Sequence, residues 1–198
     1  MELSEDFFID FEEQGYFIFD KLFSESELVA MRREIEGLKE NHEFHKAGIG
    51  KASEYKIDHN QRGDFICWID TLNPFESTRP VIAFMENLMV QLNRNFYLGI
   101  KSFECHYAIY PEGTFYKKHV DRHHRNSPRV VSFVLYLNEN WKAEDGGQLR
   151  IYSGEGVSVE VQPAAGTLVI FLSEKEHEVM LTGRSRMSLT GWLRTTPL

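Results

Sequence analysis

The spacing of hydrophobic residues changes near residue 100, and the two halves of the chain predict different structures. In the first half, apolar residues recur at helical intervals in three segments. Ser4 and Gly15 are typical of the start and end of the first helix, while Ser24 and Glu27 form a capping-box pattern that opens the second, which runs through Leu38. The third predicted helix spans residues 79–96, and the apolar runs 16–19 and 64–70 predict buried strands.

In the second half, the pattern becomes that of strands and stays so. Glycine-rich turns separate eight predicted strands, at 102–110, 116–120, 129–138, 148–153, 157–162, 167–171, 177–181 and 186–194. Helices followed by many short strands indicate an α+β, mainly β, fold in which helices pack outside a sandwich or barrel. We expect one domain over 1–198, with helical support in 1–100 and a β core in 101–198.

Residues 41–61 follow neither period. The segment is polar and contains glycine, and an irregular run of this length inside a compact domain is usually functional or mobile. Two interpretations have equal weight: a finger or lid beside the functional site, or an ordinary surface loop.

Composition narrows the class of protein. The chain is 42% hydrophobic and 26% charged, which is ordinary for a globular domain. Its net charge of −8 argues against nucleic-acid or anionic-membrane partners, which require basic surfaces. No signal peptide or membrane-length apolar run is present, so we expect a cytoplasmic protein, monomeric or weakly dimeric, with Cys67 and Cys105 as buried free thiols.

The strongest candidate for chemistry is the pair His119-x-Asp121. Residues two apart in an extended strand face the same side, so this imidazole and carboxylate can hold one metal ion. His177 is a third candidate ligand. Two histidines and one carboxylate on one face leave the opposite coordination positions open, which is typical of non-haem Fe(II) oxygenases. The absence of paired cysteine ligands disfavours structural zinc.

Arg186 follows His177 by nine residues and is a candidate anion-binding group. We expect the two strands to form a hairpin in which Leu181 pairs with Arg186 and His177 with Thr190, so that all face one side. A guanidinium inside an apolar barrel needs an anion, because an unpaired buried charge is very costly. That anion is either a protein carboxylate or a small carboxylate cosubstrate held by a bidentate contact.

Other strands direct polar groups to the same region. Alternation in 129–138 places Tyr136 where its hydroxyl can share the carboxylate held by Arg186, although a plain core position fits equally well. In 102–110, His106 and Tyr110 share a face, and His106 is interpreted as a polar group of the pocket rather than a core histidine. The basic segment 122–125 is interpreted as a solvated rim facing an acidic or polar partner.

These residues belong to an ordered string of motifs that covers most of the chain. The motifs are Arg62-Gly63-Asp64 with Trp68-Ile69, Tyr110-Pro111, Tyr116 with His119-Val120-Asp121, Leu135-Tyr136-Leu137-Asn138 with Trp141, Gly146-Gly147-Gln148-Leu149-Arg150, His177-Glu178-Val179, and Arg186 with Thr190 and Trp192. In them the chain resembles the prolyl hydroxylase branch of the Fe(II)/2-oxoglutarate-dependent dioxygenases. It is most similar to the oxygen-sensing hypoxia-factor prolyl hydroxylases and their bacterial relatives.

The resemblance implies a fold, a set of cofactors and a role for each matching residue. The fold is a double-stranded β-helix, or jelly roll, flanked by helices. The cofactors are Fe(II), 2-oxoglutarate and O2, with ascorbate as a reductant. The implied iron ligands are His119, Asp121 and His177; the implied cosubstrate residues are Arg186, Tyr136, Tyr110, Thr190 and His106; and the implied substrate-binding residues are Arg129, Asp64, Trp192 and Arg62.

Three details of the resemblance concern the surroundings of the site. It implies an ion pair between Asp64 and Arg129, and it matches residues 41–64 to a substrate-closing loop. Leu149 and Val179 join Thr190 and Trp192 at pocket-lining positions. The chain departs from the animal enzymes in two places: the loop before His119 is one residue shorter, and His106 replaces an apolar side chain.

The implied reaction is 4-hydroxylation of a prolyl residue in a flexible protein segment, with release of succinate and CO2; in bacterial relatives the family suggests a translation factor as target. Three alternatives remain open: a hydroxylase of a free amino acid or small metabolite, a non-catalytic peptide-binding or sensing module, and a zinc hydrolase. The retention of the triad with Arg186 and Tyr136 argues against the module. A hydrolase would leave Arg186 without an anion and lacks an obvious general base.

Overall fold

The computed structural model describes residues 2–48, 58, 60–122, 127–154 and 156–197. Three α-helices occur in these ranges: α1 (Glu5–Gln14), α2 (Glu25–Glu40) and α3 (Arg79–Phe96), the last preceded by a short 3₁₀ turn, η2 (Glu76–Thr78). Their ends follow the predicted signals. Ser4 caps α1, Gly15 ends it with φ of 71°, and Ser24 forms a reciprocal capping box with Glu27 at the start of α2.

The strands form two antiparallel sheets. The larger sheet has the order β1-β9-β6-β11-β4-β3-β2, and the smaller has the order β5-β10-β7-β8. Strands of the larger sheet are β1 (Tyr16–Phe19), β2 (His45–Lys46), β3 (Phe65–Ile69), β4 (Ser102–Tyr110), β6 (Arg129–Tyr136), β9 (Leu168–Leu172) and β11 (Arg186–Arg194). Those of the smaller sheet are β5 (Tyr116–His119), β7 (Leu149–Ser153), β8 (Gly156–Val161) and β10 (His177–Val179), and the 3₁₀ turn η3 (Ala143–Asp145) precedes β7.

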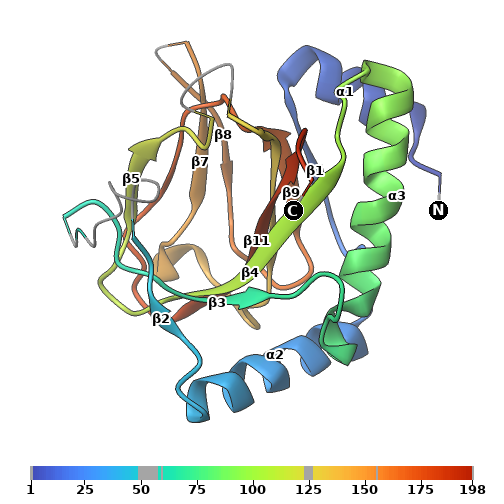
Figure 1. The fold of residues 1–198 in the computed structure, drawn as a ribbon. Helices are drawn as coiled ribbons and strands as arrows, with labels where there is room; N and C mark the ends of the chain where they lie inside the picture. Colours follow the sequence, from blue (N-terminus) through green and yellow to red (C-terminus); the bar gives the residue numbers. More distant parts are fainter. Residues whose placement is uncertain (1, 49–57, 59, 123–126, 155, 198) are drawn as a thin grey trace.

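The alternation of side chains along the larger sheet creates two hydrophobic layers. Outward-facing residues such as Tyr107, Phe133 and Leu189 pack with the buried faces of the three helices. Inward-facing residues such as Val134 and Phe171 pack against the smaller sheet. Figure 1 shows the helices gathered on one side of the strands, with α1 beside α3. The predicted mainly β, jelly-roll architecture with flanking helices is confirmed.

The predicted hairpin between His177 and Arg186 is wrong. β10 pairs with β5 and β7 in the smaller sheet, so His177 lies opposite His119 and Ile151 rather than Thr190. β11 pairs with β4 and β6 in the larger sheet. The connection between β10 and β11 crosses from one sheet to the other, and alternation alone does not distinguish such a crossover from a tight turn.

The segment 41–61 is only partly described. Its first residues include β2, which pairs with Phe65 and Ile66 of β3. The finger-loop interpretation depends on residues 49–57 and 59, which lie outside the described residues, as do residues 123–125 of the basic segment. Cys67 and Cys105 are buried free thiols, as predicted. Among the described residues, no helix combines the length and the apolar character needed to cross a membrane.

Candidate active site

A cavity between the two sheets brings together nearly all of the predicted site residues. It encloses about 90 Å³, several times the roughly 10–15 Å³ that one water molecule requires. Both sheets contribute to its walls. The predicted residues that line it are Arg62, Asp64, His106, Tyr110, His119, Asp121, Arg129, Leu149, His177, Val179, Arg186, Thr190 and Trp192.

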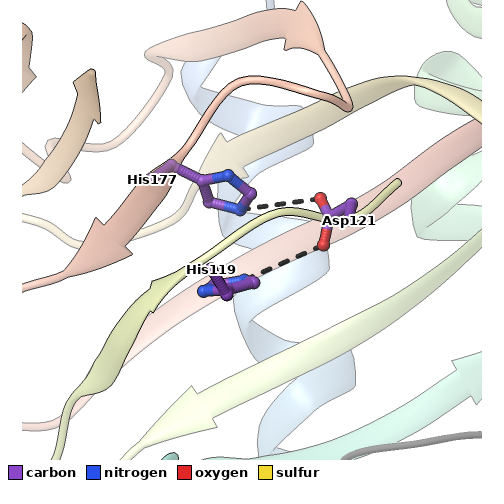
Figure 2. Close-up of side chains that lie close together, drawn as sticks. All are labelled: His119, Asp121 and His177. Carbon is purple, nitrogen blue, oxygen red and sulfur yellow. Dashed lines mark ion pairs between the residues drawn. The ribbon is translucent and has the colours of Figure 1, made fainter. Parts of the chain in front are cut away.

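The three candidate metal ligands converge in this cavity (Figure 2). Antiparallel pairing of β5 and β10 places His177 directly across from His119, although the two are far apart in sequence. Asp121 follows the end of β5 and lies beside both rings. Its two carboxylate oxygens are 3.8 Å from His119 Nε2 and 3.6 Å from His177 Nε2. One ligand atom from each residue lies within 4.8 Å of the other two.

Hydrogen bonds orient all three candidate ligands. Each histidine Nδ1 is near a backbone carbonyl, that of Lys117 at 2.7 Å for His119 and that of Lys175 at 2.9 Å for His177. An Nδ1–H donated to a carbonyl leaves Nε2 as the lone-pair atom that binds a metal. Ser132 Oγ donates to Asp121 Oδ2 at 2.6 Å. These contacts hold the three donor groups in orientations that suit one shared metal ion.

The protonation states also suit a metal. Burial, the nearby His177 and Arg62 lower the pKa of His119 to about 3, against the opposing effect of Asp121. Burial alone would raise the pKa of Asp121, but His177, His119 and the Ser132 hydroxyl outweigh it and lower the pKa below its ordinary value. Neutral imidazole nitrogens and one carboxylate oxygen, without thiolates, form a donor set that fits Fe(II).

Arg186 lies elsewhere in the same cavity and is almost fully buried, at 2% exposure. Its Nε donates to the carbonyl of Gly147 at 2.9 Å, and its guanidinium carbon lies 5.0 Å and 4.9 Å from the rings of Tyr110 and Tyr136. Within the described ranges, no carboxylate lies at ion-pair distance from it. The buried Tyr136 hydroxyl has no hydrogen bond of good geometry there either. Both groups are suited to a small carboxylate ligand.

Gly147 allows Arg186 to reach this position. Its φ of 66° lies in the left-handed region that favours glycine, and a Cβ there would be 3.1 Å from Arg186 Cδ. The Gly146-Gly147 pair between two predicted strands indicates a turn, but the backbone contact to Arg186 has no local sequence signal.

A second group of predicted residues surrounds His106. Its ring lines the cavity between the indoles of Trp68 and Trp192, with centroids 4.9 Å and 5.4 Å away. Burial, with Arg62 and Arg129 nearby, lowers the pKa of His106 to about 3. Its Nδ1 has no hydrogen-bonding partner among the described residues. His106 thus lines the cavity, and its role as a polar group of the pocket stays a prediction.

The predicted ion pair between Asp64 and Arg129 is wrong. Asp64 instead pairs with Arg62, whose Nε donates to Asp64 Oδ1 at 2.7 Å. Arg129 pairs with Glu104, with Nε and Nη2 at 2.8 Å and 2.7 Å from Oε1. Arg62 and Asp64 are two residues apart just before β3, whereas Arg129 of β6 meets Glu104 of β4, which was not among the predicted residues.

Arg62 contributes to the metal end of the cavity. Its guanidinium lies 4.4 Å from the ring centre of Tyr116, which stacks on His119 at 3.6 Å with an interplanar angle of 15°. The sequence did not predict these contacts, nor the contact of Ser132 with Asp121. The signal for Ser132 was available, because it is a polar residue on the same face of an apolar strand as Tyr136.

Comparisons with known proteins agree with this geometry. The family model described as "2OG-Fe(II) oxygenase superfamily" matches residues 105–194. The hypoxia-inducible factor prolyl hydroxylase of Caenorhabditis elegans is 30% identical over 193 residues, which are 91% of this chain and 26% of that protein. Mouse prolyl hydroxylase EGLN3 is 30% identical over 156 residues, 74% of this chain and 62% of that protein. The chain thus spans less than two thirds of the length of each of these two relatives.

Two solved structures are similar over nearly the whole chain. A prolyl-4-hydroxylase of Pseudomonas putida superposes with a TM-score of 0.87 at 39% identity, covering 96% of this chain and 97% of that one. A prolyl hydroxylase of Trichoplax adhaerens, solved with a peptide fragment of hypoxia-inducible factor, has a TM-score of 0.85 at 26% identity, covering 96% and 87%.

Proposed function

The chain belongs to the prolyl 4-hydroxylase family of the 2OG-Fe(II) oxygenase superfamily, and from this membership and its cavity we propose that it hydroxylates a prolyl residue of a protein. Enzymes of the superfamily use Fe(II), 2-oxoglutarate and O2. The observation that carries the proposal is the presence, in one cavity, of a preoriented His119–Asp121–His177 triad and an Arg186 guanidinium with no carboxylate partner among the described residues.

Each side chain has a role in this proposal. His119, Asp121 and His177 hold Fe(II) at one end of the cavity, and Arg186 with Tyr136 holds the far carboxylate of 2-oxoglutarate, which Tyr110 also approaches. When bound, Fe(II), 2-oxoglutarate and O2 would supply the oxidising chemistry that hydroxylates a C–H bond and yields succinate and CO2. Thr190 and His106 line the cosubstrate region, and Trp192, Arg129, Asp64 and Arg62 position the protein substrate.

The protein's contribution is positioning and exclusion of water. The triad and Arg186 are each held by hydrogen bonds to the backbone or to neighbouring side chains, so little reorganisation is required when ligands bind. Apolar walls such as Val134 and Leu149 exclude bulk water. Ascorbate is the proposed reductant.

The proposed target is a proline in a flexible segment, and a translation factor is the candidate protein. Relatives are named for action on hypoxia-inducible factor, and one was solved with a peptide of that factor. The family resemblance extends to bacterial enzymes for which a translation-factor loop is the expected target.

Succinate formation by the purified, Fe(II)-loaded enzyme tests the proposal. Proline-containing peptides and intact translation factors should each be compared with free proline and other free amino acids. We expect stimulation by a prolyl peptide or protein together with a mass increase of one oxygen on its proline. Stimulation by a free amino acid alone would assign the protein to metabolite hydroxylation instead.

Two controls sharpen this assay. Asp121→Ala removes a proposed iron ligand and should abolish both iron binding and turnover. Glu13→Ala, at an exposed position of α1, should leave both unchanged. Comparison of 4-hydroxyproline across the proteomes of cells with and without the chain would identify the target.

A further inference from the structure

Three charged residues and one tryptophan form a cluster at the edge of the cavity, distinct from the groups proposed to bind iron and 2-oxoglutarate. We call Glu104, Arg129, Trp192 and Arg194 the rim cluster. Antiparallel pairing brings them together, because Trp192 lies opposite Glu104 on β4 and Arg194 lies opposite Arg129 on β6. Glu104 Oε1 accepts from Arg129 at 2.7–2.8 Å, and Glu104 Oε2 lies 3.2 Å from Arg194 Nη1. Two guanidiniums thus share one carboxylate.

The rim cluster faces both the cavity and solvent. Arg129 and Trp192 line the cavity, and the guanidinium carbon of Arg129 lies 3.5 Å from the centre of the Trp192 ring. The charged side chains retain partial exposure: 26% for Arg129, 20% for Glu104 and 19% for Arg194. Trp68, whose ring is 6.3 Å from that of Trp192, is 45% exposed and extends the same edge with an apolar surface.

Charge balance distinguishes the rim cluster from the rest of the cavity. Arg62 and Asp64 neutralise one another. Histidines that bind a metal do so as neutral ligands, so bound Fe(II) together with Arg186 would balance the charges of Asp121 and of the two carboxylates of 2-oxoglutarate. The rim cluster retains one unit of positive charge in a protein whose net charge is −8. In addition, Arg194 Nε is a buried donor with no partner among the described residues.

We infer that the rim cluster binds a carboxylate side chain of the protein substrate, so that the enzyme selects prolines that have Asp or Glu nearby in the sequence. Arg194 and Arg129 supply the positive charge, Glu104 holds both guanidiniums in place, and the exposed face of Trp68 contacts apolar atoms of the same segment. This inference rests on the proposed function, because it assumes that the cavity receives a peptide.

Binding of fluorescent peptides to the Fe(II)- and 2-oxoglutarate-loaded enzyme without oxygen tests the inference separately from turnover. The peptides contain one proline and differ only in carrying Glu, Gln or Lys at a single flanking position, and each flanking position is examined in turn. At one or more positions, we expect Glu to bind about threefold to tenfold more tightly than Gln, and Lys more weakly. Added salt should reduce the difference, because the charges are partly exposed.

Three variants identify the residues responsible. Arg194→Gln should bring Glu and Gln peptides to nearly equal affinity, and Arg194→Glu should shift the preference toward Lys. Glu104→Gln keeps a neutral oxygen acceptor for the guanidiniums but removes the competing negative charge, and should therefore strengthen binding of the Glu peptide. Arg150→Gln removes a similarly exposed arginine that pairs with Glu160 in the smaller sheet, and should leave the preference unchanged. Iron content and circular dichroism verify that each variant is folded.

The outcomes separate the inference from the proposed function. Equal affinity for Glu, Gln and Lys peptides at every position, or a preference for Glu that persists in Arg194→Gln, would overturn the inference while hydroxylation of a prolyl peptide still supports the function. A Glu preference lost in Arg194→Gln supports the inference even where the proline is not hydroxylated. Absence of binding by every proline peptide would contradict both.

Discussion

At the scale of single residues, the site depends on neighbours that do not themselves bind a ligand. Ser132 is fully buried, and its hydroxyl donates to Asp121 and contacts Ser173 Oγ at 2.9 Å. This hydroxyl fixes one oxygen of the carboxylate and leaves the other available. Residues that orient metal ligands in this way contribute measurably to metal affinity.

Ser132→Ala should therefore weaken Fe(II) binding by about tenfold to 100-fold without removing a ligand. The expected cause is a carboxylate that rotates more freely and ionises less readily. Titration of the apo protein with Fe(II) under nitrogen measures the dissociation constant. Ser158→Ala, at an exposed position of β8, is the matched control. An unchanged dissociation constant would show that Asp121 is positioned by other contacts.

Arg186 is the residue whose loss should most directly affect 2-oxoglutarate. Removing one partner from a buried charge pair commonly costs 2–5 kcal/mol, so Arg186→Ala should weaken 2-oxoglutarate binding by roughly 100-fold or more. Arg186→Lys keeps the charge but loses the bidentate geometry, so its affinity for 2-oxoglutarate should lie between that of the unchanged protein and that of Arg186→Ala. Anaerobic calorimetry on the iron-loaded protein measures these affinities.

Arg184→Ala serves as the control for Arg186. Arg184 is close in sequence but partly exposed, and its guanidinium packs on Trp141 at 4.7 Å. The Arg184→Ala substitution should leave the affinity for 2-oxoglutarate unchanged. If Arg186→Ala instead weakened only peptide binding, the guanidinium would belong to the substrate rather than to the cosubstrate.

At the scale of elements, local chemistry sets the boundaries of the helices. In α2, Ser24 Oγ accepts from the Glu27 N–H at 3.3 Å, and the Glu27 carboxylate accepts from the Ser24 N–H at 2.7 Å. Leu28, Met31 and Ile35 of the same helix are buried against the shared hydrophobic core. A weaker cap should therefore reduce the stability of the whole domain.

Ser24→Ala should lower the free energy of unfolding by about 1 kcal/mol, because the first turn loses its side-chain acceptor. Urea denaturation measures the change, and iron affinity should be unaffected. Glu36→Ala, at an exposed position in the same helix, is the control and should change stability by less than about 0.5 kcal/mol. Equal effects of the two variants would show that the cap makes no special contribution.

The elements were predictable from the sequence because their signals are local, whereas their partners were not. Capping at Ser4 and Ser24 placed the starts of α1 and α2 correctly, and alternation along 102–110 and 186–194 placed both ends of β4 and β11, whereas α2 continues to Glu40, beyond the predicted Leu38. The partner of β10 depends on which sheet the chain enters after His177, and no local pattern encodes that choice.

The site shows the same division. The triad, Arg186 and Tyr136 were predicted to converge because their residue types and order are chemically specific. The structure brings the triad and Arg186 into one cavity, and the Tyr136 ring lies 4.9 Å from the Arg186 guanidinium carbon. The partner of Arg129 was predicted incorrectly, because Glu104 becomes its neighbour only through pairing of β4, β11 and β6. A contact between common residue types that are far apart in the sequence cannot be recognised from the spacing of residues along the chain.

At the scale of the whole molecule, two buried histidines couple stability to pH. The pKa values of His106 and His119 are both lowered from 6.5 to about 3, with burial as the first cause. Below about pH 6.5, the unfolded chain takes up protons that the folded chain does not. The stabilisation from these neutral side chains is therefore complete above pH 6.5 and is lost as the pH falls toward 3.

The metal-free protein should consequently lose about 2–3 kcal/mol of unfolding free energy between pH 7.5 and pH 5.5, at about 1.4 kcal/mol per histidine for each pH unit below 6.5. Urea denaturation in the presence of a chelator measures the loss. His106→Leu should reduce it by about half, because only His119 then contributes. A pH dependence unchanged by this variant would show that His106 becomes protonated without unfolding.

The division of the site between two sheets has a mechanical consequence. His119 and His177 lie on the smaller sheet, and Arg186 and Tyr136 lie on the larger one. A diacid bound by the metal at one end and by the guanidinium at the other would form a reversible, noncovalent cross-link between the two sheets. Iron alone would stabilise only the smaller sheet. The increase in melting temperature with both ligands should therefore be much larger than the sum of the increases with iron alone and with 2-oxoglutarate alone.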